Sequence, residues 1–247
     1  MKKIFTILAA LGCVSFMFSQ TNTNGYWQQH VDYTIEFEMN VESYNYSGTQ
    51  QLIYTNNSPD KLQKVFFHLY FNAFQPGSEM DVRSRTIADP DGRVMNRIQS
   101  LSTEDQGFLK VINLTQDGEK VKTTLEGTIL EVELNRHILP GKKTTFEMNF
   151  EGQVPLNVRR SGKKNAEGVE LSMAQWYPKL AEYDFEGWHA DPYIGREFHG
   201  VWGSFDVKLT IDKSYVVGGT GYLQNEKDVK IVSKTKKVKI FPNSFSL

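Results

Sequence analysis

The chain has 247 residues, a formal net charge of −1 at pH 7 and a single cysteine. The near-neutral balance excludes the broad positive field that would indicate nucleic acid or an anionic membrane as a partner. One cysteine excludes an intramolecular disulfide and a metal site built from several thiolates. The fold must therefore rest on an ordinary core, which a chain of this length can bury.

The first 20 residues have the features of a secretory signal peptide. Lys2 and Lys3 precede an apolar run over residues 4–18, and polar residues follow it. The run is shorter than the roughly 20 residues that a membrane-spanning helix needs. We therefore predict a signal peptide over 1–20, although an uncleaved membrane anchor stays open.

Export predicts a mature chain over 21–247 in the periplasm, at the cell surface or in the medium. Cys13 leaves a second alternative open, because a cysteine at this place can accept a lipid after processing. The residues that follow Cys13 stay apolar, whereas a lipidated cysteine is normally followed by a polar tether. We favour cleavage near residue 20, which would leave a mature chain without cysteine and without a membrane contact.

Alternation of apolar and polar residues dominates the rest of the chain. Over 31–39 every odd position is apolar and every even position polar, which is the period of a half-buried strand. Residues 46–55 are predicted as its antiparallel partner, and the more continuously apolar 62–71 as a strand buried on both faces. The alternating pattern recurs over 108–115, 128–134, 144–150 and 204–211, and more briefly over 229–232 and 238–241.

The stretches between these segments show no period of a long amphipathic helix. Residues 81–96 are polar and contain Pro90, so we interpret them as an excursion out of the sheet. Residues 158–168 carry four basic side chains around two glycines and are predicted as a solvated, mobile basic loop. Many short strands with turn signals predict an all-β fold with little helix, either an antiparallel β-sandwich or one large twisted sheet.

Motifs of known catalytic centres are absent from the sequence. None of the five histidines lies in a His-Glu-x-x-His pattern, and Gly-x-Ser-x-Gly, the Walker loop and the Gly-x-Gly-x-x-Gly fingerprint do not occur. The glycine-rich run 217–221 precedes no helical pattern and is predicted as a turn between strands. We therefore predict no catalytic residue in this chain.

One segment, residues 171–199, combines histidines with acidic side chains. Such side chains could bind a metal through nitrogen and oxygen. Loop residues of this kind more often serve packing and hydrogen bonding, so no metal ligand is predicted, and the metal site stays an alternative. The four residues of that alternative are His189, Asp191, Glu197 and His199.

Three of the four tryptophans, Trp176, Trp188 and Trp202, fall in or just after the same segment. Grouped on one surface, they could stack on a sugar or a peptide. In a β domain, aromatic side chains more often cover the end of a sheet or a domain boundary. Both interpretations stay open.

Four segments carry a family resemblance. The run Ser-Met-Ala-Gln-Trp-Tyr-Pro over 172–178, followed by 205–211 and 216–221, resembles the end of the N-terminal domain of aminopeptidase N-like zinc metallopeptidases. Residues 31–71 resemble the start of that domain. The resemblance runs from about Trp27 to the last residue and is strongest with the exported bacterial branch of the family.

The resemblance implies a saddle-shaped β domain that packs on a thermolysin-like catalytic domain and walls one side of its active site. It also implies that zinc belongs to the following domain, in cis, and that the present chain holds no cofactor. Gln175 matches the family glutamine that helps to hold the N-terminal residue of a peptide substrate. Tyr177 is a second substrate-binding candidate, and a turn glutamine bonded to backbone is the alternative for Gln175.

The sequence departs from the family pattern directly after this glutamine. An acidic motif with a proline is replaced here by a longer and different loop, so no residue role beyond these two is carried over. The chain also stops before the zinc-binding motif, and we expect a fragment of a zinc aminopeptidase that is inactive by itself. The alternative is a self-standing exported β-sandwich module that binds peptide or carbohydrate.

Overall fold

A computed structural model describes residues 25–87, 92, 94–195 and 198–225, together with the backbone of residues 238–240 and 242–243. The predicted signal peptide over 1–20, Cys13, Glu197 and the run 229–232 lie outside the described residues. Among the described helices, none combines the length and the apolar character that crossing a membrane requires.

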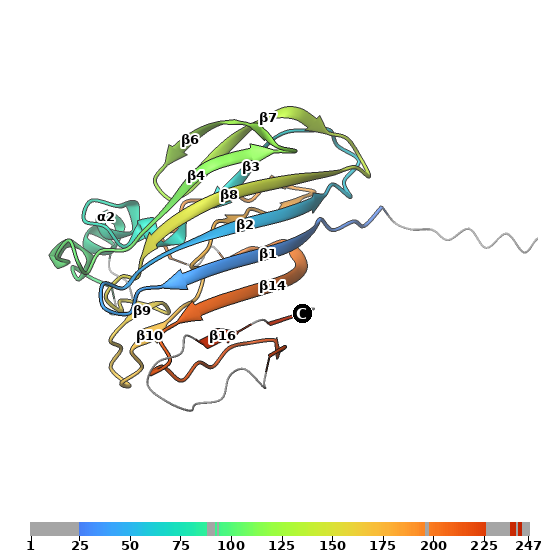
Figure 1. The fold of residues 1–247 in the computed structure, drawn as a ribbon. Helices are drawn as coiled ribbons and strands as arrows, with labels where there is room; N and C mark the ends of the chain where they lie inside the picture. Colours follow the sequence, from blue (N-terminus) through green and yellow to red (C-terminus); the bar gives the residue numbers. More distant parts are fainter. Residues whose placement is uncertain are drawn as a thin grey trace, which may run out of the picture.

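The protein is mostly β and is built around one large mixed sheet of nine strands (Figure 1). Its strands follow the order β15-β17-β14-β1-β2-β8-β4-β5, and β16 also pairs with β14. They are β1 (His30–Met39), β2 (Asn45–Thr55), β4 (Phe108–Gln116), β5 (Glu119–Lys120), β8 (Lys143–Gln153), β14 (Trp202–Ile211), β15 (Tyr222–Leu223), β16 (Val238–Ile240) and β17 (Pro242–Asn243).

A second sheet has the order β11-β3-β7-β6, and two small hairpins complete the strands. The second sheet consists of β3 (Leu62–His68), β6 (Lys122–Glu126), β7 (Ile129–Ile138) and β11 (Lys179–Leu180), and the hairpins of β9 (Gly162–Lys163) with β10 (Leu171–Ser172) and β12 (Tyr183–Asp184) with β13 (Gly187–Trp188). The described helices are α2 (Glu79–Thr86) and the 3₁₀ turns η2 (Tyr70–Ala73) and η3 (Ile98–Ser100). The all-β prediction with little helix is confirmed.

The alternating patterns form strands where they were predicted. In β1 all five odd-numbered side chains from Val31 to Met39 are buried, with exposed fractions between 0% and 8%. The next strand, β2, pairs antiparallel with β1 and with β8, so that their apolar faces form one surface. This surface packs against the second sheet, where the rings of Phe67 and Phe146 meet edge to face at 5.9 Å.

The sheet differs from the prediction in direction. Strand β14 runs parallel to β1, with His30 opposite Trp202 and Tyr33 opposite Phe205. The large sheet is therefore mixed rather than wholly antiparallel, because the crossover from β13 returns β14 to the same end from which β1 starts. Figure 1 shows the two arrowheads pointing the same way.

Two local predictions were wrong. The apolar run 62–71 is not one strand buried on both faces: Gln63 and Lys64 are exposed and the chain leaves the sheet after His68 to form η2. The loop 158–168 is not wholly solvated, since Lys163 is only 4% exposed. Its ammonium lies 3.2 Å from a carboxylate oxygen of Asp105, which offsets the cost of removing the charge from water.

The excursion predicted over 81–96 leaves the sheet as expected and contains most of α2. The helix starts at Glu79 because Ser78 caps it, accepting a hydrogen bond from the backbone N–H of Asp81. Its eight residues are too few and too polar for a helical period to show in the sequence.

Candidate functional site

Residues 174–180, which contain both predicted substrate-binding residues, lie against the buried face of β1 and β2. Three polar side chains of these strands hold the backbone of the segment. The hydroxyl of Tyr46 donates to the carbonyl of Trp176 at 2.6 Å, and the amide of Gln50 donates to the carbonyl of Pro178 at 2.9 Å. The hydroxyl of Tyr33 accepts from the N–H of Leu180 at 2.9 Å.

Gln175 stands in the middle of this pinned segment and has a left-handed backbone, with φ of 58°. For a residue with a side chain this conformation costs on the order of 1 kcal/mol or more, and it persists only where neighbours fix it. The neighbour Ala174 is bound on both sides: its N–H donates to Oγ of Ser161 at 2.7 Å, and its carbonyl accepts from the same hydroxyl. The bonds of Ala174 therefore hold Gln175 in a backbone conformation that lowers the stability of the fold.

The side chain of Gln175 lines a surface groove of about 560 Å³ together with Tyr177, Lys179, Phe198 and Phe205. Its Oε1 accepts from the ammonium of Lys179 at 3.3 Å. This is the one hydrogen bond that the Gln175 side chain makes among the described residues. The alternative interpretation, in which the Gln175 side chain bonds to backbone, finds no support among them. Within the described part of the chain, the amide N–H groups and the second lone pair of Oε1 have no protein partner.

Tyr177 packs by its ring. It meets the rings of Tyr33, Trp176 and Phe205 edge to face, with centroids 5.4 to 5.9 Å apart. Burial raises the pKa of the Tyr177 phenol well above its usual value, so the group stays neutral. Tyr177 thus forms an apolar wall beside Gln175.

The three tryptophans do not form one surface. Trp176 contacts Tyr46 near the start of β2, whereas Trp188 contacts Tyr54 near its end. Eight residues of strand separate these two tyrosines by roughly 26 Å. Trp202 stands opposite His30, which belongs to the other face of the sheet from Val31 and Tyr33. The aromatic platform predicted as an alternative is therefore not assembled.

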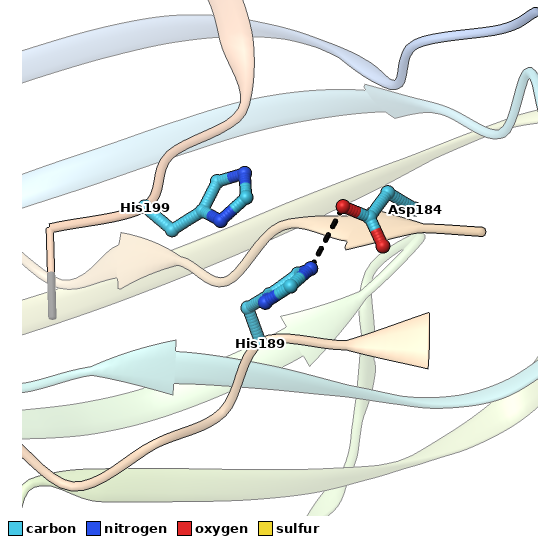
Figure 2. Close-up of side chains that lie close together, drawn as sticks. All are labelled: Asp184, His189 and His199. Carbon is cyan, nitrogen blue, oxygen red and sulfur yellow. Dashed lines mark ion pairs between the residues drawn. The ribbon is translucent and has the colours of Figure 1, made fainter. Parts of the chain in front are cut away.

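A cluster of possible metal ligands lies at a different place on the same crossover segment (Figure 2). Ligand atoms of Asp184, His189 and His199 all lie within 4.8 Å of one another. Nε2 of His189 is 2.8 Å from Oδ2 of Asp184, and the rings of His189 and His199 are 4.2 Å apart. We refer to these three residues as the Asp184 cluster.

The Asp184 cluster differs from the four residues that the sequence suggested. It keeps both histidines, replaces Asp191 by Asp184, and leaves Glu197 outside the described residues. Gly187, with φ of 101°, was the one local signal that could have identified Asp184 as a member of the cluster. It pairs with Asp184 across a hairpin with a two-residue loop, and this hairpin brings Asp184 close to His189.

A buried carboxyl, Glu182, and a half-buried ammonium, Lys179, stand along the chain between Gln175 and Asp184. Glu182 is 6% exposed, and burial, with a smaller contribution from Asp184, raises the pKa of its carboxyl to about 7. His189 and Lys179 act in the opposite direction. Burial lowers the pKa of the Lys179 ammonium, and Glu182 partly offsets this. The Asp184 carboxyl has a lowered pKa although burial opposes it, because Glu186 N–H and His189 stabilise its charge.

No family model matches the sequence, and no curated protein matches it. Solved structures with a similar arrangement are found. One is a variant of a two-domain M1 zinc metallopeptidase bound to L-tryptophan, with a TM-score of 0.49 and 15% identity, over 89% of this chain and 40% of that one. Another is a variant M1 zinc metallopeptidase from Deinococcus radiodurans bound to a Tyr-Ser-Ala substrate, with a TM-score of 0.49 and 14% identity, over 88% and 39%. The chain spans about 40% of the length of these structures.

Proposed function

We propose that this chain is the non-catalytic N-terminal domain of an exported zinc aminopeptidase. In this proposal zinc belongs to a following domain of the parent protein, where it activates water and polarises the scissile carbonyl. The present domain packs on that domain and positions the peptide. The ordered set of segments that resembles this family, from residue 31 to residue 221, supports the proposal.

The geometry of Gln175 is the observation that carries the substrate-binding part. A strained backbone held by Ser161 on one side and Tyr46 on the other is typical of a residue kept for function rather than for stability. Its amide faces a groove and keeps donors and an acceptor for the N-terminal residue of a peptide. A neutral amide does this without competing for zinc.

The groove wall supports the same use. Tyr177 and Phe205 give it an apolar lining next to the amide, which suits the side chain of a terminal residue. Lys179 lies beside Gln175 and donates to its Oε1, which orients the amide in the groove. Binding energy at this place would be used for positioning.

Kinetics of the parent enzyme test this role. Replacing Gln175 with Ala should lower kcat/KM for an aminoacyl anilide with a free N-terminus about 10-fold or more, as expected for loss of a hydrogen bond to a charged group. Thr103→Ala, a change in a loop away from the groove, is the matched control and should leave kcat/KM unchanged. An unaltered kcat/KM in the Gln175 variant would refute the role.

The inactivity of the chain by itself has its own test. The purified chain is incubated with an aminoacyl anilide and added Zn²⁺, with and without a chelator. We expect no hydrolysis above the buffer blank. Hydrolysis that the chelator abolishes would show that the chain carries a catalytic centre of its own.

A further inference from the structure

The Asp184 cluster joins two parts of the crossover that leads to β14. Asp184 belongs to the β12–β13 hairpin, His189 directly follows its last residue, and His199 lies in the segment just before Trp202. Figure 2 shows the three side chains pointing toward a common centre from two separate stretches of backbone.

The hairpin is held rigidly. Tyr183 pairs with Trp188 across its two strands, and their rings lie 5.1 Å apart. Trp188 packs edge to face on Phe66 of the second sheet, and Trp27 stacks on the outer side of Tyr183. The ligands of a metal site need such support, because a site on an unsupported loop is not preorganised.

Bonds to other groups orient the carboxylate of Asp184 and fix the backbone of His189. Oδ1 of Asp184 accepts from the N–H of Glu186 at 2.8 Å, which leaves Oδ2 directed at His189. The backbone N–H of His189 donates to the carbonyl of Glu182 at 2.9 Å. Outer bonds of this kind fix the direction of a ligand and are a regular part of metal sites.

The position of His199 is set by its neighbour. Phe198 packs against the rings of Tyr70 and Tyr193, with centroids 5.3 Å and 5.0 Å away, and Arg160 lies over its face. His199 is exposed, so its ring can rotate toward an ion without displacing core side chains.

We propose that Asp184, His189 and His199 bind one divalent transition-metal ion of the zinc class. Two imidazoles and one carboxylate are ligands that Zn²⁺ accepts, with one coordination position left for water or another donor. Tetrahedral ligands about 2.0–2.2 Å from zinc are separated from each other by roughly 3.3–3.5 Å. The ligand atoms of His189 and Asp184, now 2.8 Å apart, would have to separate by roughly 0.5–0.7 Å. The ligand atom of His199 already lies within 4.8 Å of both and would have to move closer by a similar small amount or more.

The bound ion would link the hairpin to the entry of β14. Because β14 is the parallel neighbour of β1, an ion here fixes the place where the crossover rejoins the large sheet. Binding to the folded chain alone raises its stability by mass action. The site therefore predicts a zinc-dependent rise in the melting temperature.

The test measures zinc uptake by the purified chain, without a histidine tag and after removal of metal by chelator and desalting. Equilibrium dialysis against Zn²⁺ with elemental analysis gives stoichiometry and affinity, and the absorption spectrum with Co²⁺ reports nitrogen and oxygen ligands. We expect one equivalent of zinc and a higher melting temperature. No stoichiometric uptake would overturn the proposal.

Variants assign the ligands. Loss of an outer partner of a ligand already lowers metal affinity about 10- to 100-fold, so His199→Ala and Asp184→Asn should each lower it at least as much. The control is His30→Ala, because His30 and Asp32 form a half-exposed pair at 3.0 Å to which the described residues add no third ligand. Circular dichroism checks that each variant is folded. Equal losses in the control and the cluster variants would show adventitious binding only and overturn the assignment.

Discussion

The hydroxyl of Tyr46, on the second strand of the large sheet, donates a 2.6 Å hydrogen bond to the carbonyl of Trp176, which lies 130 residues further along the chain. The Tyr46 ring lies over Gly152 of β8, where an added Cβ would come within 2.2 Å of it. The sheet thus sets the position of the peptide unit between Trp176 and Tyr177, directly after the residue that follows Gln175. Side chains deep in the fold, rather than the loop itself, define the candidate substrate contact.

Removing this hydroxyl should destabilise the protein. Tyr46→Phe leaves the ring in place and the Trp176 carbonyl without its partner, which costs about 1–3 kcal/mol in the free energy of unfolding. Tyr54→Phe is the matched control on the same strand, since the hydroxyl of Tyr54 has no hydrogen-bond partner among the described residues. Urea unfolding should show a loss for Tyr46→Phe and none for Tyr54→Phe; equal effects would contradict this account.

A methyl group at Gly152 should have a related effect for a steric reason. Gly152→Ala forces the Tyr46 ring out of its place, and overpacking of this kind costs about 1–3 kcal/mol. Gly218→Ala is the control, because an added Cβ there meets no atom within 4 Å. Thermal unfolding followed by circular dichroism distinguishes them. A melting temperature of Gly152→Ala at or above that of Gly218→Ala would show that the ring is not confined.

Gln175 should be a position where function and stability conflict. Glycine adopts a positive φ without strain, so Gln175→Gly should keep the free energy of unfolding or raise it by up to about 1 kcal/mol. The same variant loses the amide and should weaken peptide binding in the parent enzyme. A clear loss of stability in urea unfolding would mean that the side chain serves packing, contrary to the proposed role.

The buried carboxyl of Glu182 gives a prediction about pH. Its pKa is raised from 4.5 to about 7, so the folded state keeps a proton that the unfolded state releases. The stabilising contribution is complete below pH 4.5, and the free energy of unfolding decreases as the pH rises to about 7.

Glu182→Gln mimics the protonated form and removes this dependence. The variant should match the wild type near pH 4.5 and exceed its stability near pH 8, with a chelator present throughout so that metal does not contribute. Urea unfolding at several pH values measures the difference between the two proteins. A difference that does not change with pH would show that Glu182 does not titrate as described.

The strands were predictable from the sequence, but their partners were not. Alternation over 31–39 gives the period of a strand and its buried face, and both were found. Over 204–211 the strand was found, but of its alternating apolar side chains only Ile211 is buried. The same period is compatible with parallel or antiparallel pairing, so the parallel contact between β1 and β14 could not be derived from it. Direction depends on where the crossover returns, which is a property of the whole fold.

The candidate sites show the same limit. Gln175 was identified by a local motif, while its strain and its support by Ser161 and Tyr46 depend on residues far apart in sequence. Asp184 was missed because its contact with His189 follows from a two-residue hairpin, for which Gly187 was the one local signal. The buried Lys163 was missed for a similar reason, since its partner Asp105 is distant along the chain.

The central claim is that this chain is the N-terminal domain of a zinc aminopeptidase, and reading the coding sequence beyond the codon for Leu247 tests it most directly. The account predicts an open frame that continues into a domain with a His-Glu-x-x-His motif and a downstream glutamate, the ligands of a peptidase zinc. A stop codon at that place, followed by unrelated sequence, would contradict the claim and favour a self-standing exported binding module.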